Sequence, residues 1–168
     1  MQLFAARHMK KDLNMNAKLL AIIAIVLWAG SAAFVGFKFI SGTTLTATDG
    51  RAAIVLEHAE RDFILTEMRG FLVAVQEVIS AANKNDMDSI KKTSHRVGMA
   101  EVAGVAPETM LKLPMAFKQL GMSTHEGFDE IGLAAEIGPD AVLDALDANL
   151  SKCIACHESY RLTTADQK

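Results

Sequence analysis

The ten residues KCIACHESYR, positions 152 to 161, hold both cysteines of the chain, and a histidine directly follows the second one. Two thiols three residues apart with an adjacent imidazole, Cys153, Cys156 and His157, match the C-x-x-C-H attachment pattern of a c-type haem. In that pattern the thiols bond to the vinyl groups of the haem and the imidazole ligates its iron from one face. We therefore expect one covalently attached haem c, with His157 as an iron ligand.

Three other uses of such a cysteine pair fit this sequence less well. A thioredoxin-like dithiol lies at the start of a helix, where the helix dipole lowers a thiol pKa, whereas this pair is expected at the far end of a helix. A closed structural zinc site needs four ligands, and the chain has no second C-x-x-C. A disulfide bond across three residues of one helix has poor geometry.

Apolar residues with helical spacing come before this motif. Positions i, i+3, i+4 and i+7 repeat from Arg51 to about Asn83, which predicts one long amphipathic helix. Asp86 is the expected N-cap of a second helix that runs to about Val102. The stretch 107–121 is expected to be a loop with a helical turn or two.

The last third of the chain predicts two more helices. The sequence STHE, residues 123–126, has the pattern of a capping box and is expected to open the third helix. Gly138–Pro139 then ends this helix and begins a fourth, whose apolar seam reaches the C-x-x-C-H motif. Because no stretch alternates with period two, we expect an all-α chain in which residues 51–168 form an antiparallel four-helix bundle.

An apolar segment precedes this domain. The residues LLAIIAIVLWAGSAAFVGF, positions 19–37, carry no charge, and as a helix they would span about 28 Å, close to the ~30 Å hydrocarbon core of a bilayer. A cleavable signal peptide has a shorter apolar region of about 7–15 residues. The length of the segment therefore favours a retained transmembrane helix, or an uncleaved signal, at residues 19–40, with cleavage as the alternative. A linker at 41–50 follows.

The charge distribution indicates topology and partners. Residues 1–18 carry four basic side chains and one acidic one, which predicts a cytoplasmic N-terminus. Haem is attached outside the cytoplasm in bacteria, so we expect a single-pass protein of the bacterial inner membrane with its C-terminal domain in the periplasm. Residues 41–168 carry 12 basic and 19 acidic side chains, which argues against nucleic acid and for a redox partner with a basic docking patch.

With its haem motif at the end of the last of four helices, the region 51–165 resembles the class II c-type cytochromes, the cytochrome c-prime family. The ending CIACHESYR is similar to that of the family, with Tyr160 and Arg161 after the motif. The resemblance implies haem between the first and fourth helices, often in a homodimer. One helical turn beyond His157, Arg161 is expected to bind a haem propionate or, alternatively, to be a solvated cation at the helix end. The N-terminal anchor departs from the family, many of whose members resemble secreted proteins.

The residue on the second face of the iron decides the function. Counting down two antiparallel helices from Asn83 and Pro139 places Leu65 and Met68 near the level of His157. If Met68 ligates the iron, the haem is six-coordinate and low-spin, and the protein carries single electrons. We favour this interpretation, while ordinary core packing would also explain a methionine at this position.

In the alternative interpretation the iron stays open. The family pattern of an arginine followed four residues later by a haem-facing residue falls on Arg61 and Leu65, and Leu65 would then cover a five-coordinate iron that binds nitric oxide or carbon monoxide. His58 lies about 10 Å below the expected level and is a weaker ligand candidate than Met68, and His95 and His125 are interpreted as surface or cap-adjacent residues. No catalytic residue set with a specific spacing is recognisable, so we do not expect an enzyme.

Overall fold

The computed structural model describes residues 2–102 and 105–167, and for residues 2–16 and 101 it describes only the backbone. The chain divides into two compact units, Met1–Phe37 and Lys38–Lys168. Most of the described residues are helical, in six α-helices, one of which is apolar and N-terminal. The expected predominance of helix is therefore confirmed.

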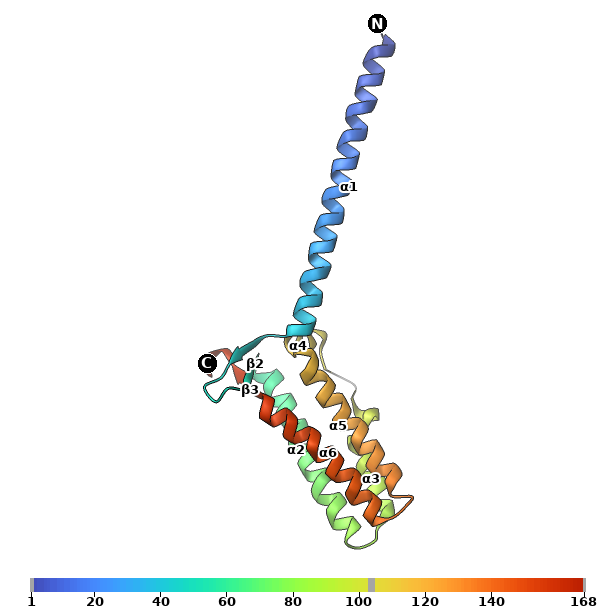
Figure 1. The fold of residues 1–168 in the computed structure, drawn as a ribbon, viewed down its shortest axis with the longest axis vertical. Coiled ribbons are helices and arrows are strands. Elements are labelled where there is room, and N and C mark those ends of the chain that lie inside the picture. The colour runs from blue at the N-terminus through green and yellow to red at the C-terminus, as the bar shows by residue number, and fades with distance from the viewer. Residues whose placement is uncertain (1, 103–104, 168) are drawn as a thin grey trace. The chain divides into compact units, whose positions relative to one another are not determined.

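The first unit consists of most of α1, Gln2–Ser41 (Figure 1). The part Ala17–Ser41 has a mean hydropathy of 2.4. A helix of this length and composition is able to cross a membrane, as expected for residues 19–40.

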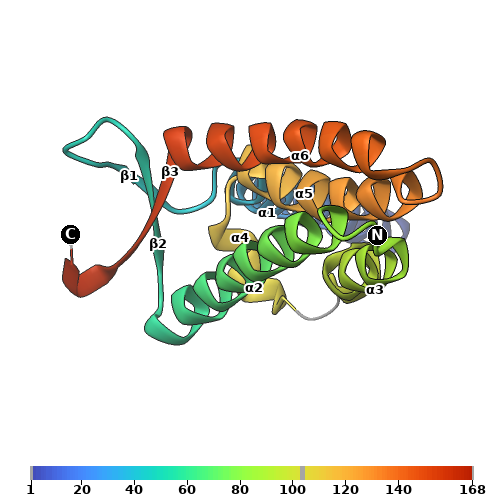
Figure 2. The same cartoon turned by 90° about the horizontal axis from the view of Figure 1, so that it is seen from below.

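The second unit contains the remaining helices and two 3-10 turns. They are α2 (His58–Ala82), α3 (Met87–Val97), η1 (Met99–Glu101), α4 (Pro107–Lys112), α5 (Met115–Ala134), α6 (Pro139–Ser159) and η2 (Ala165–Gln167). Figures 1 and 2 show α2, α3, α5 and α6 side by side. As predicted, Asp86 caps α3, where its Oδ1 accepts a hydrogen bond from Ser89 N at 3.1 Å. Gly138–Pro139 separates α5 from α6, also as predicted.

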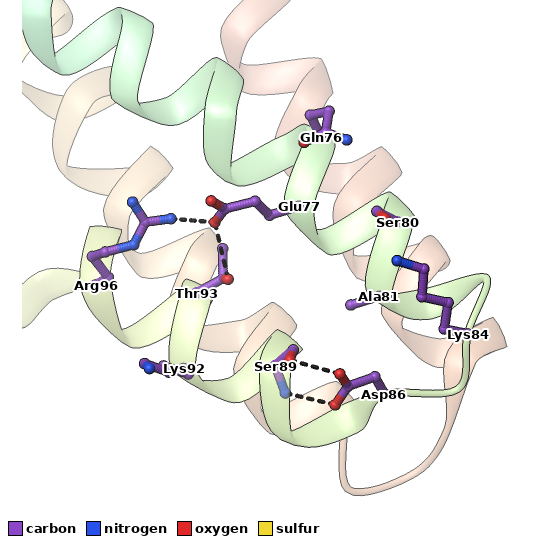
Figure 3. A pocket seen from close by; sticks show the side chains of 10 residues that line it. All are labelled: Gln76, Glu77, Ser80, Ala81, Lys84, Asp86, Ser89, Lys92, Thr93 and Arg96. Atoms are coloured by element: carbon purple, nitrogen blue, oxygen red, sulfur yellow. Dashed lines mark hydrogen bonds and ion pairs between the residues drawn. The ribbon is translucent and has the colours of Figure 1, made fainter.

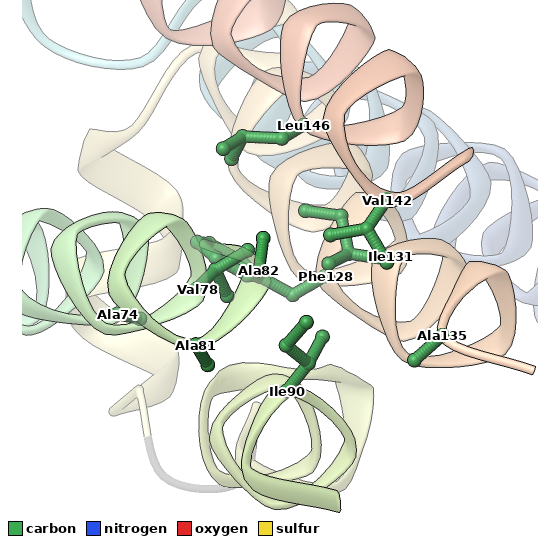
Figure 4. Packing of buried hydrophobic residues seen from close by; sticks show 10 residues of the cluster. All are labelled: Ala74, Val78, Ala81, Ala82, Ile90, Phe128, Ile131, Ala135, Val142 and Leu146. Atoms are coloured by element: carbon green, nitrogen blue, oxygen red, sulfur yellow. The ribbon is translucent and has the colours of Figure 1, made fainter. Parts of the chain in front are cut away.

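These four helices share one apolar core (Figure 4). Phe128 and Ile131 of α5 are fully buried against Val78 of α2, Ile90 of α3 and Val142 of α6. Burial of each such large side chain contributes about 1.5–3 kcal/mol. The other members are small or aliphatic: Ala74, Ala81, Ala82, Ala135 and Leu146. The contacts of α6 with this core fix the helix that carries the C-x-x-C-H motif.

A three-stranded sheet, which sequence analysis did not predict, stands at the end of the unit where α2 begins and α6 ends (Figure 2). Strand β1 (Thr44–Thr46) pairs antiparallel with β2 (Ala52–Leu56), which pairs parallel with β3 (Tyr160–Thr164). The expectation of helix from Arg51 onward is therefore wrong for residues 52–56. A short apolar run such as AAIVL has no helical or strand periodicity of its own, and its pairing with β3 decides its structure.

The true start of α2 has a recognisable cap. Glu57 and Glu60 form a reciprocal capping box, in which Oε2 of Glu60 accepts a hydrogen bond from Glu57 N at 2.8 Å. Lys112 of α4 donates to the same Glu60 oxygen at 2.7 Å. The helix therefore begins seven residues later than Arg51, at His58.

The predicted loop at 107–121 and the predicted capping box at 123–126 are both wrong. Pro114 is the N-cap residue of α5, so it begins this helix rather than breaking it. Residues 123–126 lie in the interior of α5, where the Ser123 and Thr124 hydroxyls donate to the Leu120 carbonyl at 3.0 and 2.9 Å. Such bonds to the preceding turn let serine and threonine remain inside a helix instead of capping one.

Candidate functional site

Two adjoining cavities of the second unit share Leu65, Met68 and His157. The first, which we call the apolar cleft, has a volume of about 370 Å³ and is bordered by α2 and α6, with Phe128 of α5 between them. The second, which we call the arginine pocket, has a volume of about 220 Å³ and lies where α2, α5 and α6 meet the sheet. Its lining includes Arg51 and Arg161.

The walls of the apolar cleft expose hydrophobic surface. Leu72 of α2 is 70% exposed although it lines this cleft beside half-buried Phe71 and Val75. Leaving apolar surface in water costs about 25 cal/mol per Å². The arrangement therefore suits a flat apolar group that would cover these side chains.

The two cysteines open on different cavities. Cys153 is half-buried and lines the apolar cleft, whereas Cys156 is buried and lines the arginine pocket. Both are free thiols, and burial raises the pKa of each, with the neighbouring Cys153 thiol adding to the shift at Cys156. Neutral thiols at the C-terminal end of a helix do not suit a dithiol oxidoreductase, whose attacking thiol has a lowered pKa.

Leu65 and Met68 lie beside His157, as the helical rise along the two helices predicted. Both are half-buried on α2, and together with His157 they line both cavities. Met68 also packs against the second apolar cluster, which contains Phe117 and Cys156. Arg61 is not among the lining residues of either cavity, and its Nη1 lies 3.9 Å from Asp62 Oδ1.

Arg161 reaches the site from an unexpected element. We expected it one helical turn beyond His157, but α6 ends at Ser159 and Tyr160 has extended backbone angles, φ −129° and ψ 152°. Pairing with β2 draws this segment out of the helix, so Arg161 lies on β3. It nevertheless lines the arginine pocket together with His157.

Arg51 is the site residue that sequence reasoning missed. Its Nη1 donates to the backbone carbonyls of His157 at 3.1 Å and of Tyr160 at 3.4 Å. Its Nε and Nη2 donate to Oδ2 of Asp49 at 3.0 and 2.7 Å. These hydrogen bonds hold the pKa of the Asp49 carboxyl below its usual value. No local pattern predicts the role of Arg51, because the two carbonyl groups to which it donates, those of His157 and Tyr160, lie at the other end of the chain.

His58, His95 and His125 line neither cavity. His58 is exposed, with Nε2 3.3 Å from Asp166 Oδ1, and His95 is exposed as expected. The expectation for His125 is wrong, because the residue is 8% exposed inside α5. Its Nδ1 lies 2.8 Å from the Val97 carbonyl oxygen and its ring packs edge-on against Phe71.

A polar cavity of about 380 Å³ lies between α2 and α3 (Figure 3). Glu77 accepts a hydrogen bond from Thr93 Oγ1 at 3.1 Å and forms an ion pair with Arg96. Asp86 is engaged by Ser89 as the cap of α3. Both carboxylates of this cavity are therefore already engaged by neighbouring side chains. Among the side chains that the structure describes, those of residues 17–100, 102 and 105–167, no group of three or more His, Cys, Asp or Glu is placed to hold a metal ion.

Comparisons with family models, with curated proteins and with solved structures found no match for this chain.

Proposed function

We propose that this protein is a monohaem c-type cytochrome whose second unit is an antiparallel four-helix bundle of the cytochrome c-prime type. The observation that carries the proposal is the position of Cys153, Cys156 and His157, which line two adjoining cavities that also contain Met68 and Leu65. The C-x-x-C-H motif alone does not require a cavity beside it. Here the motif borders an apolar cleft of fitting chemistry.

The residues present fit a haem in three respects. Leu65, Leu72 and Phe128 offer apolar walls to a ring, and Cys153 and Cys156 offer neutral thiols one helical turn apart. In the arginine pocket, Arg161 would offer its guanidinium to a carboxylate substituent of the haem. His157 would hold the iron from one side, and Met68 is the candidate for a second ligand from the chain. When bound, the haem supplies one-electron redox chemistry.

Met68 is the residue that we assign to the second face of the iron. Its thioether belongs to an otherwise apolar cluster with Phe117 and Cys156, which would keep water from an iron ligated there. A His157 and Met68 pair raises the reduction potential of a haem and suits rapid electron transfer. The protein would then carry single electrons and would not be an enzyme.

The alternative function is a binding protein for nitric oxide or carbon monoxide. It is favoured by Leu65, which lines both cavities as Met68 does and would cover an open iron if Met68 only packs. The two functions differ in the coordination number of the iron.

We further propose that α1 anchors the protein in the bacterial inner membrane, with the second unit in the periplasm. The basic residues among positions 1–18 favour a cytoplasmic N-terminus. This anchoring would hold the domain near membrane redox proteins, and the acidic balance of residues 41–168 favours a partner with a basic surface. The rate of electron transfer to such a partner should fall as the ionic strength rises, and a rate independent of salt would exclude this mode of docking. The family resemblance further implies a homodimer, which sedimentation of the detergent-solubilised protein would test.

The visible spectrum of the reduced protein, with and without carbon monoxide, tests the proposal. We expect a low-spin spectrum that carbon monoxide does not change, and a high-spin, gas-binding spectrum for Met68→Ala. Met110→Ala is the matched control, because Met110 packs in the same apolar cluster but lines neither cavity. A high-spin wild type that binds gas would establish the alternative, and absence of covalent haem from protein made in a haem-attaching host would refute both.

A further inference from the structure

The last turn of α6 ends at Ser159, and the extended C-cap residue Tyr160 donates its backbone N–H to the Cys156 carbonyl but leaves the His157 carbonyl without a helical partner. The terminal carbonyl groups of any helix lack intrahelical partners, and the final turn is the part that frays. His157 lies in this turn, two residues before the end of the helix, and its side chain is exposed. The position of its imidazole therefore depends on what holds the backbone.

Arg51 holds this backbone from a distant part of the sequence. The parallel register of β2 and β3 places Ala52 opposite Tyr160, so Arg51, one residue earlier, lies beside the end of α6. From there its Nη1 donates to the carbonyl oxygens of His157 and Tyr160, at 3.1 and 3.4 Å. Its positive charge also interacts favourably with the negative, C-terminal end of the helix dipole.

The Arg51 guanidinium is itself oriented by Asp49. Two hydrogen bonds from Nε and Nη2 to Oδ2 of Asp49 fix the plane of the group and leave Nη1 directed at α6. The turn between β1 and β2 sets the two residues in place, through hydrogen bonds from Ala47 N to the Arg51 carbonyl and from Gly50 N to the Ala47 carbonyl. Gly50 has φ +85°, a backbone conformation that favours glycine, so the turn depends on a glycine at this position.

We propose that Arg51 is a positioning residue for His157: by capping the last turn of α6 from the β1–β2 turn, it holds the imidazole at the mouth of the two cavities. The proposal rests on the proposed haem function only for the ligand role of His157. The cap itself is a property of the chain, and it is tested without haem as well as with it.

The first test is amide hydrogen exchange of the full-length protein in detergent, in wild type and in Arg51→Gln. Loss of the cap should speed exchange in the last turn of α6 at least tenfold, equivalent to about 1.4 kcal/mol, relative to amides in the middle of the same helix near Leu146. Arg61→Gln is the matched control, because it removes the same charge while Arg61 lines neither cavity and its Nη1 lies 3.9 Å from Asp62 Oδ1. Arg51→Lys should restore part of the protection, since an ammonium group can still donate to one carbonyl.

The second test is the iron spectrum of the haem-loaded protein during heating. In Arg51→Gln we expect the His157-ligated low-spin spectrum to be lost at a lower temperature than the far-UV circular dichroism signal, and in Arg61→Gln we expect both to change together. Equal behaviour of the two variants in both tests would show that only charge matters and would overturn the proposal. If wild type carries no haem, the proposed function fails while the exchange experiment still decides whether Arg51 caps α6.

Discussion

The substitution Gly127→Ala tests how closely α5 packs on α6, the helix that carries the haem motif. An added Cβ would overlap Oδ1 of Asn149, and would lie 2.5 Å from its Cγ and 2.9 Å from Nζ of Lys152. Asn149 is 2% exposed, and its Nδ2 donates to the Thr124 carbonyl at 3.2 Å. Its side chain would have to turn away from the new methyl group, which breaks that bond, and α5 and α6 would also have to move apart.

The expected loss follows from opposing contributions. Alanine in place of glycine inside a helix contributes about 0.8–1.0 kcal/mol of stability. Overpacking costs about 1–3 kcal/mol, and leaving the Thr124 carbonyl buried without its donor costs about another 1–3 kcal/mol. The net free energy of unfolding should therefore fall by about 1–5 kcal/mol. Gly121 of the same helix has nothing within 4 Å of an added Cβ, so Gly121→Ala should retain only the gain of up to about 1 kcal/mol.

Thermal unfolding of the full-length protein in detergent, followed by far-UV circular dichroism, compares these two variants. A difference of about 2 kcal/mol or more between them corresponds to at least about 5 °C in Tm for a domain of this size. If Gly127→Ala unfolds at the same temperature as Gly121→Ala, then the close contact between Gly127 and Asn149 does not exist and the placement of α6 on α5 is incorrect.

Three further outcomes are expected. Burial raises the pKa of Glu67 in the folded state, so the charged carboxylate destabilises the fold above that pKa. Glu67→Gln should therefore have a higher Tm than wild type at pH 7, and this difference should vanish below about pH 4, where Glu67 is neutral in both states. An equal difference in Tm at both pH values would contradict this assignment. Asp86→Ala should lower Tm by removing the cap on α3, and by more than Asp88→Ala, which removes an acidic side chain from the first turn but no cap. Equal Tm changes in the two variants would count against the cap. If α1 is a retained anchor, the protein should stay in the membrane pellet after extraction with alkaline carbonate, and its intact mass should include α1. Release of the protein into the supernatant would exclude the anchor.

Features that depend on neighbouring residues could be predicted from the sequence. The apolar run of α1, the Asp86 cap and the Gly138–Pro139 break all act over a few residues, and each was located correctly. The level of Met68 relative to His157 was also within reach, because a helix rises by a constant ~1.5 Å per residue. Whether Met68 ligates iron stays a prediction.

Features that depend on distant pairing could not be predicted. The run Ala52–Leu56 is too short to show a period, and it is a strand because Tyr160–Thr164 lies beside it. The same pairing moves Arg161 off the helix on which we had expected it. Residues 123–126 match a capping box in composition, but the helix had already begun at Met115, so their hydroxyls bond within it.

The sequence by itself determined the chemistry that this protein has at its disposal: two thiols at positions i and i+3, an imidazole directly after them and an apolar segment able to span a bilayer. These are local relations, and covalent geometry maintains them in any fold. Only the tertiary structure decided that Arg51 lies at the end of α6 and that Leu65 and Met68 border the same cavities as His157. Such contacts form when helices and strands far apart in the chain bury their apolar faces together, and the residues involved carry no local trace of the partner they will meet.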